Sequence, residues 1–220
     1  MSETHGTLDW AARIRERAAA CGIDLGDPLP DVLAAHVESV LRVNTELHLT
    51  AITEPDEYLE RHLGESFEGA AMVDPDATGQ VLDIGSGNGY PGLPLAAARP
   101  RLQVTLAEAS RRKAAFLRQL VRESVVANAS VLEVQVQRPG DLEGFGPFRL
   151  VTSRAMGGWS KILPRLAPML EPGGEMLVWA GDDVEKIAKR AAWRRLAPVD
   201  RRRLPGRNQS WIWRFRPVGN

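Results

Sequence analysis

The chain has one cysteine among its 220 residues, Cys21, and only four histidines. A single cysteine excludes an internal disulfide bond and a cysteine-based metal cluster. The histidines do not have metal-ligand spacing either, so we expect no metal site. No apolar run reaches the about 18 residues of a membrane span, and the N-terminus has no signal-peptide pattern. These absences predict a cytoplasmic protein that binds neither a metal nor a membrane.

The formal net charge is zero, but the charges are unevenly distributed. Residues 1–79 contain 16 acidic and 5 basic residues, whereas residues 186–216 contain 11 basic residues and one acidic residue. A basic end of this kind is typical of a protein that binds phosphate groups. It is equally typical of a solvated, arginine-rich surface, so the charge pattern leaves both interpretations open.

The first 75 residues have the pattern of helices. Asp31 stands where a helix cap is expected, before apolar residues at helical spacing. A further helix is predicted from Pro55 to Phe67, and Pro75 and Gly79 end the helical pattern. We therefore expect a helical cap over residues 1–75 that packs on the rest of the protein. The apolar series of the first helix is Leu33, Val37, Val40 and Leu47.

From residue 76 to residue 220 the pattern changes to strands that alternate with helices. Such alternation is typical of a parallel sheet covered by helices on both faces, which is an α/β fold. The predicted strands are 81–84, 104–106, 131–136, 148–152, 175–179, 196–203 and 211–215, and the predicted helices are 93–98, 111–123, 161–170 and 184–195.

A glycine-rich motif, Val81–Gly89, follows the first predicted strand of this region. Its glycines permit a tight turn and a close approach of the backbone to a ligand. Asp83, two residues before the first glycine, is placed to reach a cationic ligand. Tyr90 occupies the position where a dinucleotide fingerprint has its last glycine, and no lysine stands in the P-loop position. The motif therefore favours a cofactor that carries a positive charge.

Glu108 ends the next predicted strand, 23 residues after Gly85. A carboxylate at this point accepts hydrogen bonds from ribose hydroxyls, which suits S-adenosylmethionine and NAD alike. Asp83 and Tyr90 favour S-adenosylmethionine. A nicotinamide enzyme and a strand–helix unit without a ligand stay as alternatives.

The extended motif Asp83–Leu95, DIGSGNGYPGLPL, closely resembles a signature of the bacterial small-subunit rRNA guanine-N7 methyltransferases, also called the glucose-inhibited division protein B family. The generic methyltransferase pattern ends at Gly89, so the following Pro-Gly-Leu-Pro makes the resemblance specific. Other stretches agree with the family in the same order along the chain: Leu49–Ile52, Glu60–Leu63, Arg112–Leu117, Val151–Ala155 and Glu171–Gly174.

The resemblance implies a class I S-adenosylmethionine-dependent methyltransferase: a Rossmann-like, mostly parallel, seven-stranded sheet with an N-terminal helical cap. The family methylates N7 of one guanine in the decoding region of 16S rRNA, so the implied cofactor is S-adenosyl-L-methionine and the implied partner is 16S rRNA or the small ribosomal subunit. Arg154 is the implied catalytic residue, next to the methyl donor and the target base. The implied cofactor-binding residues are Asp83, Gly85, Ser86, Gly87, Gly89, Tyr90, Glu108 and Arg154, and the implied substrate-binding residues are His48, Arg112, Lys113, Arg138 and Arg207.

The sequence departs from the family pattern on the substrate side. His48 replaces an asparagine, and Glu65 replaces an aspartate. Ala180–Gly181 stands where lysine-glycine is common. Arg207 comes a few residues before the place of the usual C-terminal arginine, near Ser210. The alternative is thus a divergent paralogue that binds S-adenosylmethionine but methylates another RNA or a small molecule, or that has no catalytic activity.

Overall fold

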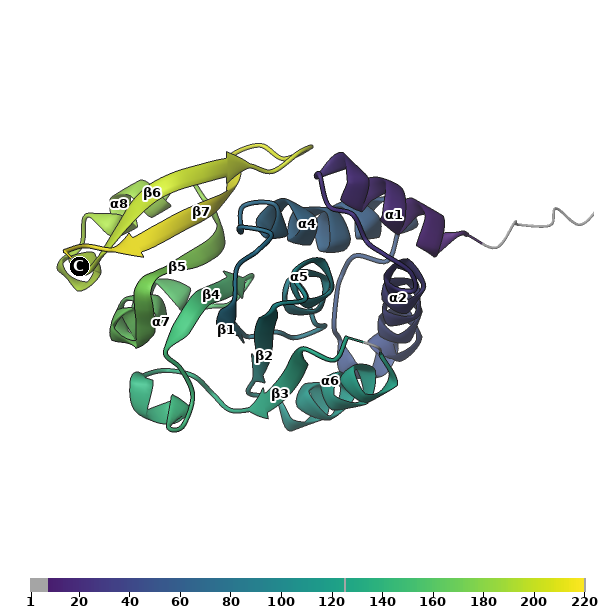
Figure 1. Ribbon diagram of the computed structural model, residues 1–220, viewed down its shortest axis with the longest axis horizontal. Coiled ribbons are helices and arrows are strands. Elements are labelled where there is room, and N and C mark those ends of the chain that lie inside the picture. Colours follow the sequence, from purple (N-terminus) through teal and green to yellow (C-terminus); the bar gives the residue numbers. More distant parts are fainter. Residues whose placement is uncertain (1–7, 125, 220) are drawn as a thin grey trace, which may run out of the picture.

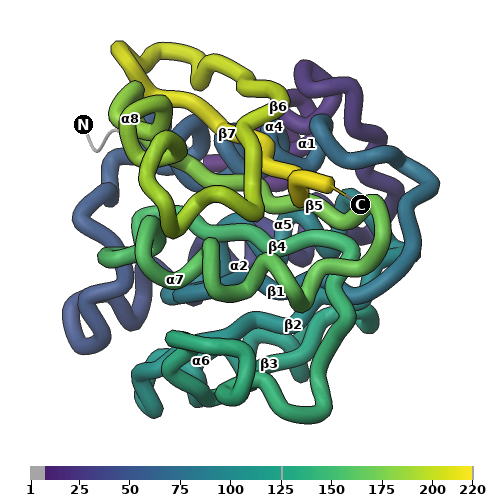
Figure 2. The backbone as a smooth tube through the Cα atoms, turned by 90° about the vertical axis from the view of Figure 1, so that its left-hand side faces the viewer, coloured from purple at the N-terminus to yellow at the C-terminus, as the bar shows by residue number. Residues whose placement is uncertain are grey.

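A computed structural model of the protein describes residues 8–124 and 126–219. Its centre is one seven-stranded sheet with the strand order β3-β2-β1-β4-β5-β7-β6. The first five strands are parallel, and β7 runs antiparallel between β5 and β6. Figure 2 shows these strands stacked as a ladder, from β3 at the bottom to the yellow β6–β7 hairpin at the top. The strands are β1 Gly79–Ile84, β2 Leu102–Glu108, β3 Ala129–Glu133, β4 Phe148–Arg154, β5 Leu170–Gly181, β6 Leu196–Arg203 and β7 Ser210–Pro217. The predicted α/β class is confirmed.

Helices cover both faces of the sheet (Figure 1). Successive strand side chains point to opposite faces, and the core divides accordingly. Val81 packs with α5 and α6 in one apolar cluster, whereas its neighbour Leu82 packs with α7 and α8 in another. The sheet helices are α5 Gly92–Ala98, α6 Arg111–Glu123, α7 Trp159–Leu166 and α8 Val184–Ala188. In the described residues, no helix is both long and apolar enough to cross a membrane.

The N-terminal helices pack on the α5–α6 face and share its apolar cluster. The first seven residues of the predicted cap lie outside the described residues, and the division of the chain at residue 75 stays a prediction. The shared core nevertheless fixes the cap helices against the face of the sheet that α5 and α6 cover. These helices are α1 Trp10–Ala20, α2 Leu29–Leu47, α3 Pro55–Tyr58, the π-helical turn η1 Leu59–Gly64 and α4 Glu65–Ala70.

Several predicted element ends are wrong. Asp31 does not cap a helix, because α2 begins at Leu29 and Asp31 lies in its first turn. The helix begins early because Pro30 is tolerated in a first turn, where its missing N–H costs nothing. The predicted helix 161–170 ends at Leu166, before a 3-10 turn that contains Pro168. The predicted helix 184–195 ends at Ala188, and the strand predicted at 131–136 is 129–133.

The helix predicted from Pro55 to Phe67 is continuous but contains η1 as a wider turn. A π-helical turn inserts an extra residue and leaves carbonyl groups free for other donors. Here the carbonyl of Arg61, within η1, accepts a hydrogen bond from the guanidinium of Arg154 at the end of β4. The turn therefore connects the cap to the sheet at the end of β4.

Gly92, at the start of α5, lies against β1 and β2. A Cβ atom there would come within 2.2 Å of Leu106 Cδ2 and 2.9 Å of Asp83 Oδ2. We expect Gly92→Ala to lower the free energy of unfolding by about 1–3 kcal/mol in urea titrations, the usual cost of overpacking. Gly140→Ala is the matched control, since a Cβ at Gly140 meets no atom within 4 Å. Equal stability of the two variants would contradict this prediction.

Candidate active site

The turn after β1 has the backbone conformation that its glycines predict. Gly85, Gly87 and Gly89 have φ values of 73°, 53° and 93°, which side chains other than glycine rarely adopt. The hydroxyl of Ser86 donates a 2.9 Å hydrogen bond to the carbonyl of Asp83 and closes the turn. A Cβ at Gly87 would contact only the Gly85 carbonyl, at 3.8 Å, so the outer side of the turn has room for a ligand.

The carboxyl group of Asp83 lies below this turn and is 1% exposed. Thr152 Oγ1 donates a 2.7 Å hydrogen bond to Oδ1, while Oδ2 has no partner among the described residues. Burial raises the pKa of Asp83. A buried acceptor without a donor costs free energy unless a ligand supplies one. The amino group of S-adenosylmethionine, directly or through water, is a donor of the required kind.

Glu108, the last residue of β2, connects the turn to the start of α6. Its Oε2 accepts a 2.9 Å hydrogen bond from the Gly87 amide, and its Oε1 accepts a 2.7 Å bond from the Ser110 amide. Each oxygen keeps a lone pair for a ribose hydroxyl. Together with the orphaned oxygen of Asp83 and the open turn, this carboxylate fits S-adenosylmethionine.

Arg154, at the end of β4, lies under the cap. Its Nη2 donates a 2.8 Å hydrogen bond to Nδ1 of His62, so His62 carries its proton on Nε2, which donates to Thr50 Oγ1 at 2.8 Å. Burial, and the positive charge of Arg154, lower the pKa of His62 to about 3, so the ring is neutral. The role of His62 could not be predicted from the sequence, since 92 residues separate it from Arg154 and no local pattern links them.

Tyr90, directly after the glycine turn, is 2% exposed and lies under the cap. Its ring stacks on His36 at 4.5 Å and on His62 at 5.0 Å between centroids. The hydroxyl of Tyr58 is 3.4 Å from that of Tyr90. The side chain of Tyr90 thus supports the site by packing, and its contact with the cofactor stays a prediction.

A cavity of about 320 Å³ opens beside Arg154, between the ends of β4 and β5, the cap and the β6–β7 turn. We call it the β4–β5 pocket. Its size suits a small ligand or one base. Three of the departures from the family pattern meet here: Glu65, Ala180–Gly181, and the shifted Arg207 with Ser210 near the expected place. Only His48 lies elsewhere. The wall of the pocket includes Arg61, Glu65, Arg154, Trp179, Leu204 and Arg207.

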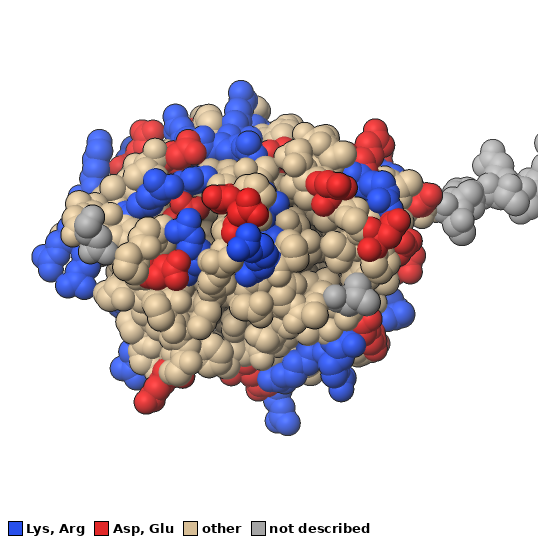
Figure 3. Space-filling view, viewed as in Figure 1, with Lys and Arg blue, Asp and Glu red and all other residues tan. Residues whose placement is uncertain are grey.

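The other predicted substrate residues lie on two surfaces. His48, exposed at the end of α2, is next to the start of α6: its carbonyl is 3.4 Å from Lys113 Nζ, and Arg112 Nη2 is 3.2 Å from the Glu46 carbonyl. Basic side chains gather along this lower edge of the molecule in Figure 3, where α6 lies in Figure 1. Arg138 lies separately in the β3–β4 connection, paired with Asp141 at 3.4 Å.

Several arginines of the basic C-terminal segment are paired with acidic residues of the same chain. Arg202 contacts Glu68 of α4 at 3.2 Å, and Arg207 contacts Glu65 at 3.1 Å. Arg214 and Arg216 lie 3.6 Å and 3.2 Å from Glu175. The acidic first part and the basic last part of the chain thus neutralise each other in part, so the charge counts overstate the free positive surface.

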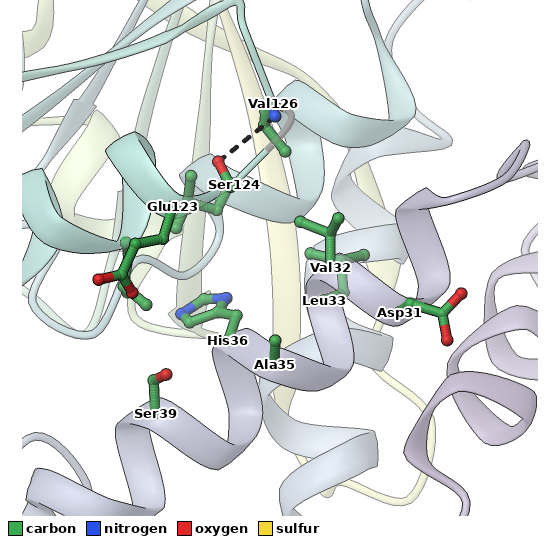
Figure 4. Close-up of a pocket in the computed structure, with 11 residues that line it drawn as sticks. Asp31, Val32, Leu33, Ala35, His36, Ser39, Glu123, Ser124 and Val126 are labelled. Atoms are coloured by element: carbon green, nitrogen blue, oxygen red, sulfur yellow. Dashed lines mark hydrogen bonds between the residues drawn. The ribbon is translucent and has the colours of Figure 1, made fainter.

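A second cavity, of about 240 Å³, lies between α2 and α6 (Figure 4). In this view His36 points into the space between the two helices, and Glu123 and Asp31 lie on opposite sides. Nε2 of His36 donates a 2.7 Å hydrogen bond to the Asn88 carbonyl, so this neutral ring supports the glycine turn from behind. Burial lowers the pKa of His36 to about 4.

The strand order, the glycine turn and the two carboxylates define a class I S-adenosylmethionine-dependent methyltransferase. The chain belongs to the rRNA small subunit methyltransferase G family, whose sequence profile matches residues 31–195. The family resemblance and the fold class are thereby confirmed.

Individual relatives agree with this assignment. The chain is 36% identical to the ribosomal RNA small subunit methyltransferase G of Sorangium cellulosum, over 81% of this chain and 75% of the relative. The chain is 35% identical to the ribosomal RNA small subunit methyltransferase G of Stenotrophomonas maltophilia, over 94% of both chains. Among solved structures, the glycopeptide N-methyltransferase MtfA complexed with S-adenosyl-L-methionine is similar with a TM-score of 0.57, at 13% identity over 70% of this chain and 86% of that one. This last likeness shows the fold alone.

Proposed function

We propose that this protein transfers the methyl group of S-adenosylmethionine to N7 of a guanine in 16S rRNA of the small ribosomal subunit. One observation carries the proposal: the glycine turn with Asp83 and Glu108 lies beside a base-sized pocket that contains Arg154. Membership of the rRNA small subunit methyltransferase G family supports an RNA substrate. Because bacterial ribosomes are assembled in the cytoplasm, the proposal includes a cytoplasmic location.

The chemistry suits a site without a general base. N7 of guanine has a free lone pair and no proton to lose, and S-adenosylmethionine supplies an activated methyl group. As the N–C bond forms, the electrons of the S–C bond stay on sulfur and the positive charge moves onto the base. The protein therefore has to align the two partners and to compensate this charge.

Residues of this chain divide that task. Asp83, Glu108 and the turn hold the cofactor, and Arg154 lies at the end of β4 where the base enters. The basic surface at Arg112 and Lys113 binds RNA phosphates, which gives salt-dependent affinity. Arg138, His48 and Arg207 are the remaining proposed substrate contacts.

The test is tritiated-methyl transfer to unmethylated small subunits and to their naked 16S rRNA, with identification of the product nucleoside. We expect N7-methylguanosine in the 16S rRNA. Incorporation into another nucleoside, or none while calorimetry confirms cofactor binding, would refute the proposed function and favour a divergent paralogue.

A further inference from the structure

Glu65 is the acidic residue in the wall of the β4–β5 pocket, and its side chain is almost fully buried, with the whole residue 4% exposed. Its backbone is fixed, since Trp179 Nε1 donates a 3.1 Å hydrogen bond to its carbonyl. A buried carboxylate is costly unless each oxygen is paired. The partners of the two oxygens therefore indicate what the pocket requires.

The two oxygens of Glu65 have different surroundings. Oε1 accepts a 3.1 Å hydrogen bond from Arg207 Nη1. Oε2 has Arg154 Nη1 as its nearest cation, at 3.7 Å, which is beyond hydrogen-bond distance. Among the described residues, none donates a hydrogen bond to Oε2. The pocket thus presents an acceptor, Oε2, next to the guanidinium of Arg154. The guanidinium of Arg61 also lines the pocket, but it lies on the side of Oε1, at 3.9 Å.

We propose that Glu65 selects guanine as the target base, by accepting a hydrogen bond from guanine N1–H at Oε2. This inference rests on the proposed function. Enzymes that modify a base take it out of the stack and read its Watson–Crick edge in a pocket. Guanine has O6, an acceptor, next to N1–H, a donor. Arg154 and Glu65 match this order.

Adenine has the reverse order, a donor at N6 next to an acceptor at N1. In the same position it would place its N6 donor against Arg154 and its N1 lone pair against the carboxylate. Sites built to hydrogen-bond one group reject an analogue that leaves buried polar groups unpaired. The pair of charges therefore discriminates between the two purines.

Glu65 also contributes to the reaction itself. The positive charge that develops on the base as N7 is methylated makes N1–H a stronger hydrogen-bond donor. A carboxylate held at N1 thus interacts more strongly with the transition state than with the bound substrate, which raises kcat.

The experiment compares Glu65→Gln and Glu65→Asp with the control Glu68→Gln. Glu68 is on the same helix and paired with Arg17 and Arg202, at 3.2 Å each, but it does not line the pocket. The substrates are unmethylated small subunits that carry either guanine or adenine at the nucleotide that the wild type methylates. Transfer rates, the dissociation constant of S-adenosylmethionine and thermal unfolding are measured for each protein.

We expect Glu65→Gln to lower kcat/KM on guanine by about 10- to 100-fold, mostly through kcat. This is the expected effect of losing one hydrogen bond to a charged group. Its preference for guanine over adenine should fall, since the amide can donate to adenine N1. Cofactor binding should not change. Glu65→Asp should keep the guanine preference, and Glu68→Gln should behave as wild type.

If Glu65→Gln lowers the transfer rate by the same factor on guanine and on adenine, or does not lower it, this inference is overturned while the proposed function stays in place. No transfer by the wild type would overturn the proposed function and this inference with it.

The pH profile gives an independent readout. Burial raises the pKa of Glu65 to about 7, although Arg154 and Arg61 oppose the rise. We therefore expect wild-type kcat to increase with pH through about 7, as Glu65 loses its proton, and Glu65→Gln to lack this step. A step of the same size in Glu65→Gln would count against the inference. The charged or titratable groups around Glu65 are Glu60, Arg61 and His62 of η1, Arg154 of β4 and Arg207 of the β6–β7 turn.

Discussion

Arg154→Ala is expected to lower kcat for methyl transfer by at least about 100-fold and the free energy of unfolding by about 3 kcal/mol. The change removes the donor that pairs with Nδ1 of His62 and with the carbonyl of Arg61, and it takes away the cation next to Oε2 of Glu65. Binding of S-adenosylmethionine should stay nearly unchanged, because the proposed partner of Arg154 is the target base.

Single-turnover transfer, urea unfolding and calorimetry with the cofactor measure these three effects. Arg149→Ala is the matched control, since Arg149 is on the same strand but pairs with the Gly173 carbonyl away from the site. Arg154→Lys separates charge from geometry: lysine keeps the charge but cannot contact two acceptors with a planar fork, so kcat should stay low. Loss of cofactor binding equal to the loss of transfer would contradict the assignment of Arg154 to the base.

Asp83→Asn is expected to weaken binding of S-adenosylmethionine by about 10- to 100-fold without lowering the stability of the cofactor-free protein. Burial raises the pKa of Asp83 above its value in the unfolded chain. The folded state therefore binds the proton more tightly, and ionisation of Asp83 costs stability as pH rises through that pKa. Removing the charge relieves this cost at neutral pH, while the cofactor loses its charged acceptor.

Calorimetry gives the dissociation constant, and thermal unfolding without cofactor gives the stability. Glu175→Gln is the contrasting control: this carboxylate is also buried but is paired with Arg214 and Arg216, so its loss should lower stability and leave cofactor binding unchanged. An unchanged dissociation constant for Asp83→Asn would remove Asp83 from the cofactor site.

These two variants differ because the two charged groups have different tasks. Arg154 donates hydrogen bonds to Arg61 and His62 of the cap, so it holds the cap and the sheet together as well as facing the base. Asp83 retains an unpaired oxygen, the arrangement expected of a group whose stabilising partner is a ligand. The site thus combines one residue that contributes to stability with one that reduces it.

The sequence by itself determined the sheet and the cofactor side. Strand and helix periods are local, and glycine turns need specific residues at fixed spacing, so Gly85, Gly87, Asp83 and Glu108 could be predicted as cofactor residues without a structure. The helix 111–123 was predicted with its observed ends, and Ser110 caps its start by accepting a hydrogen bond from the Lys113 amide at its hydroxyl oxygen. Ends set by packing, such as that of α8, were missed.

Only the tertiary structure decided the substrate side. Glu65, Arg154, Ala180 and Arg207 come from four distant segments, and their separation along the chain carries no signal of contact. The neutralisation of C-terminal arginines by acids of the cap was likewise invisible in the charge counts, since pairing depends on how β6 and β7 pack beside α4. Local patterns specify a chain's turns and helices, whereas the partners of a buried charge are set by the packing of the whole fold.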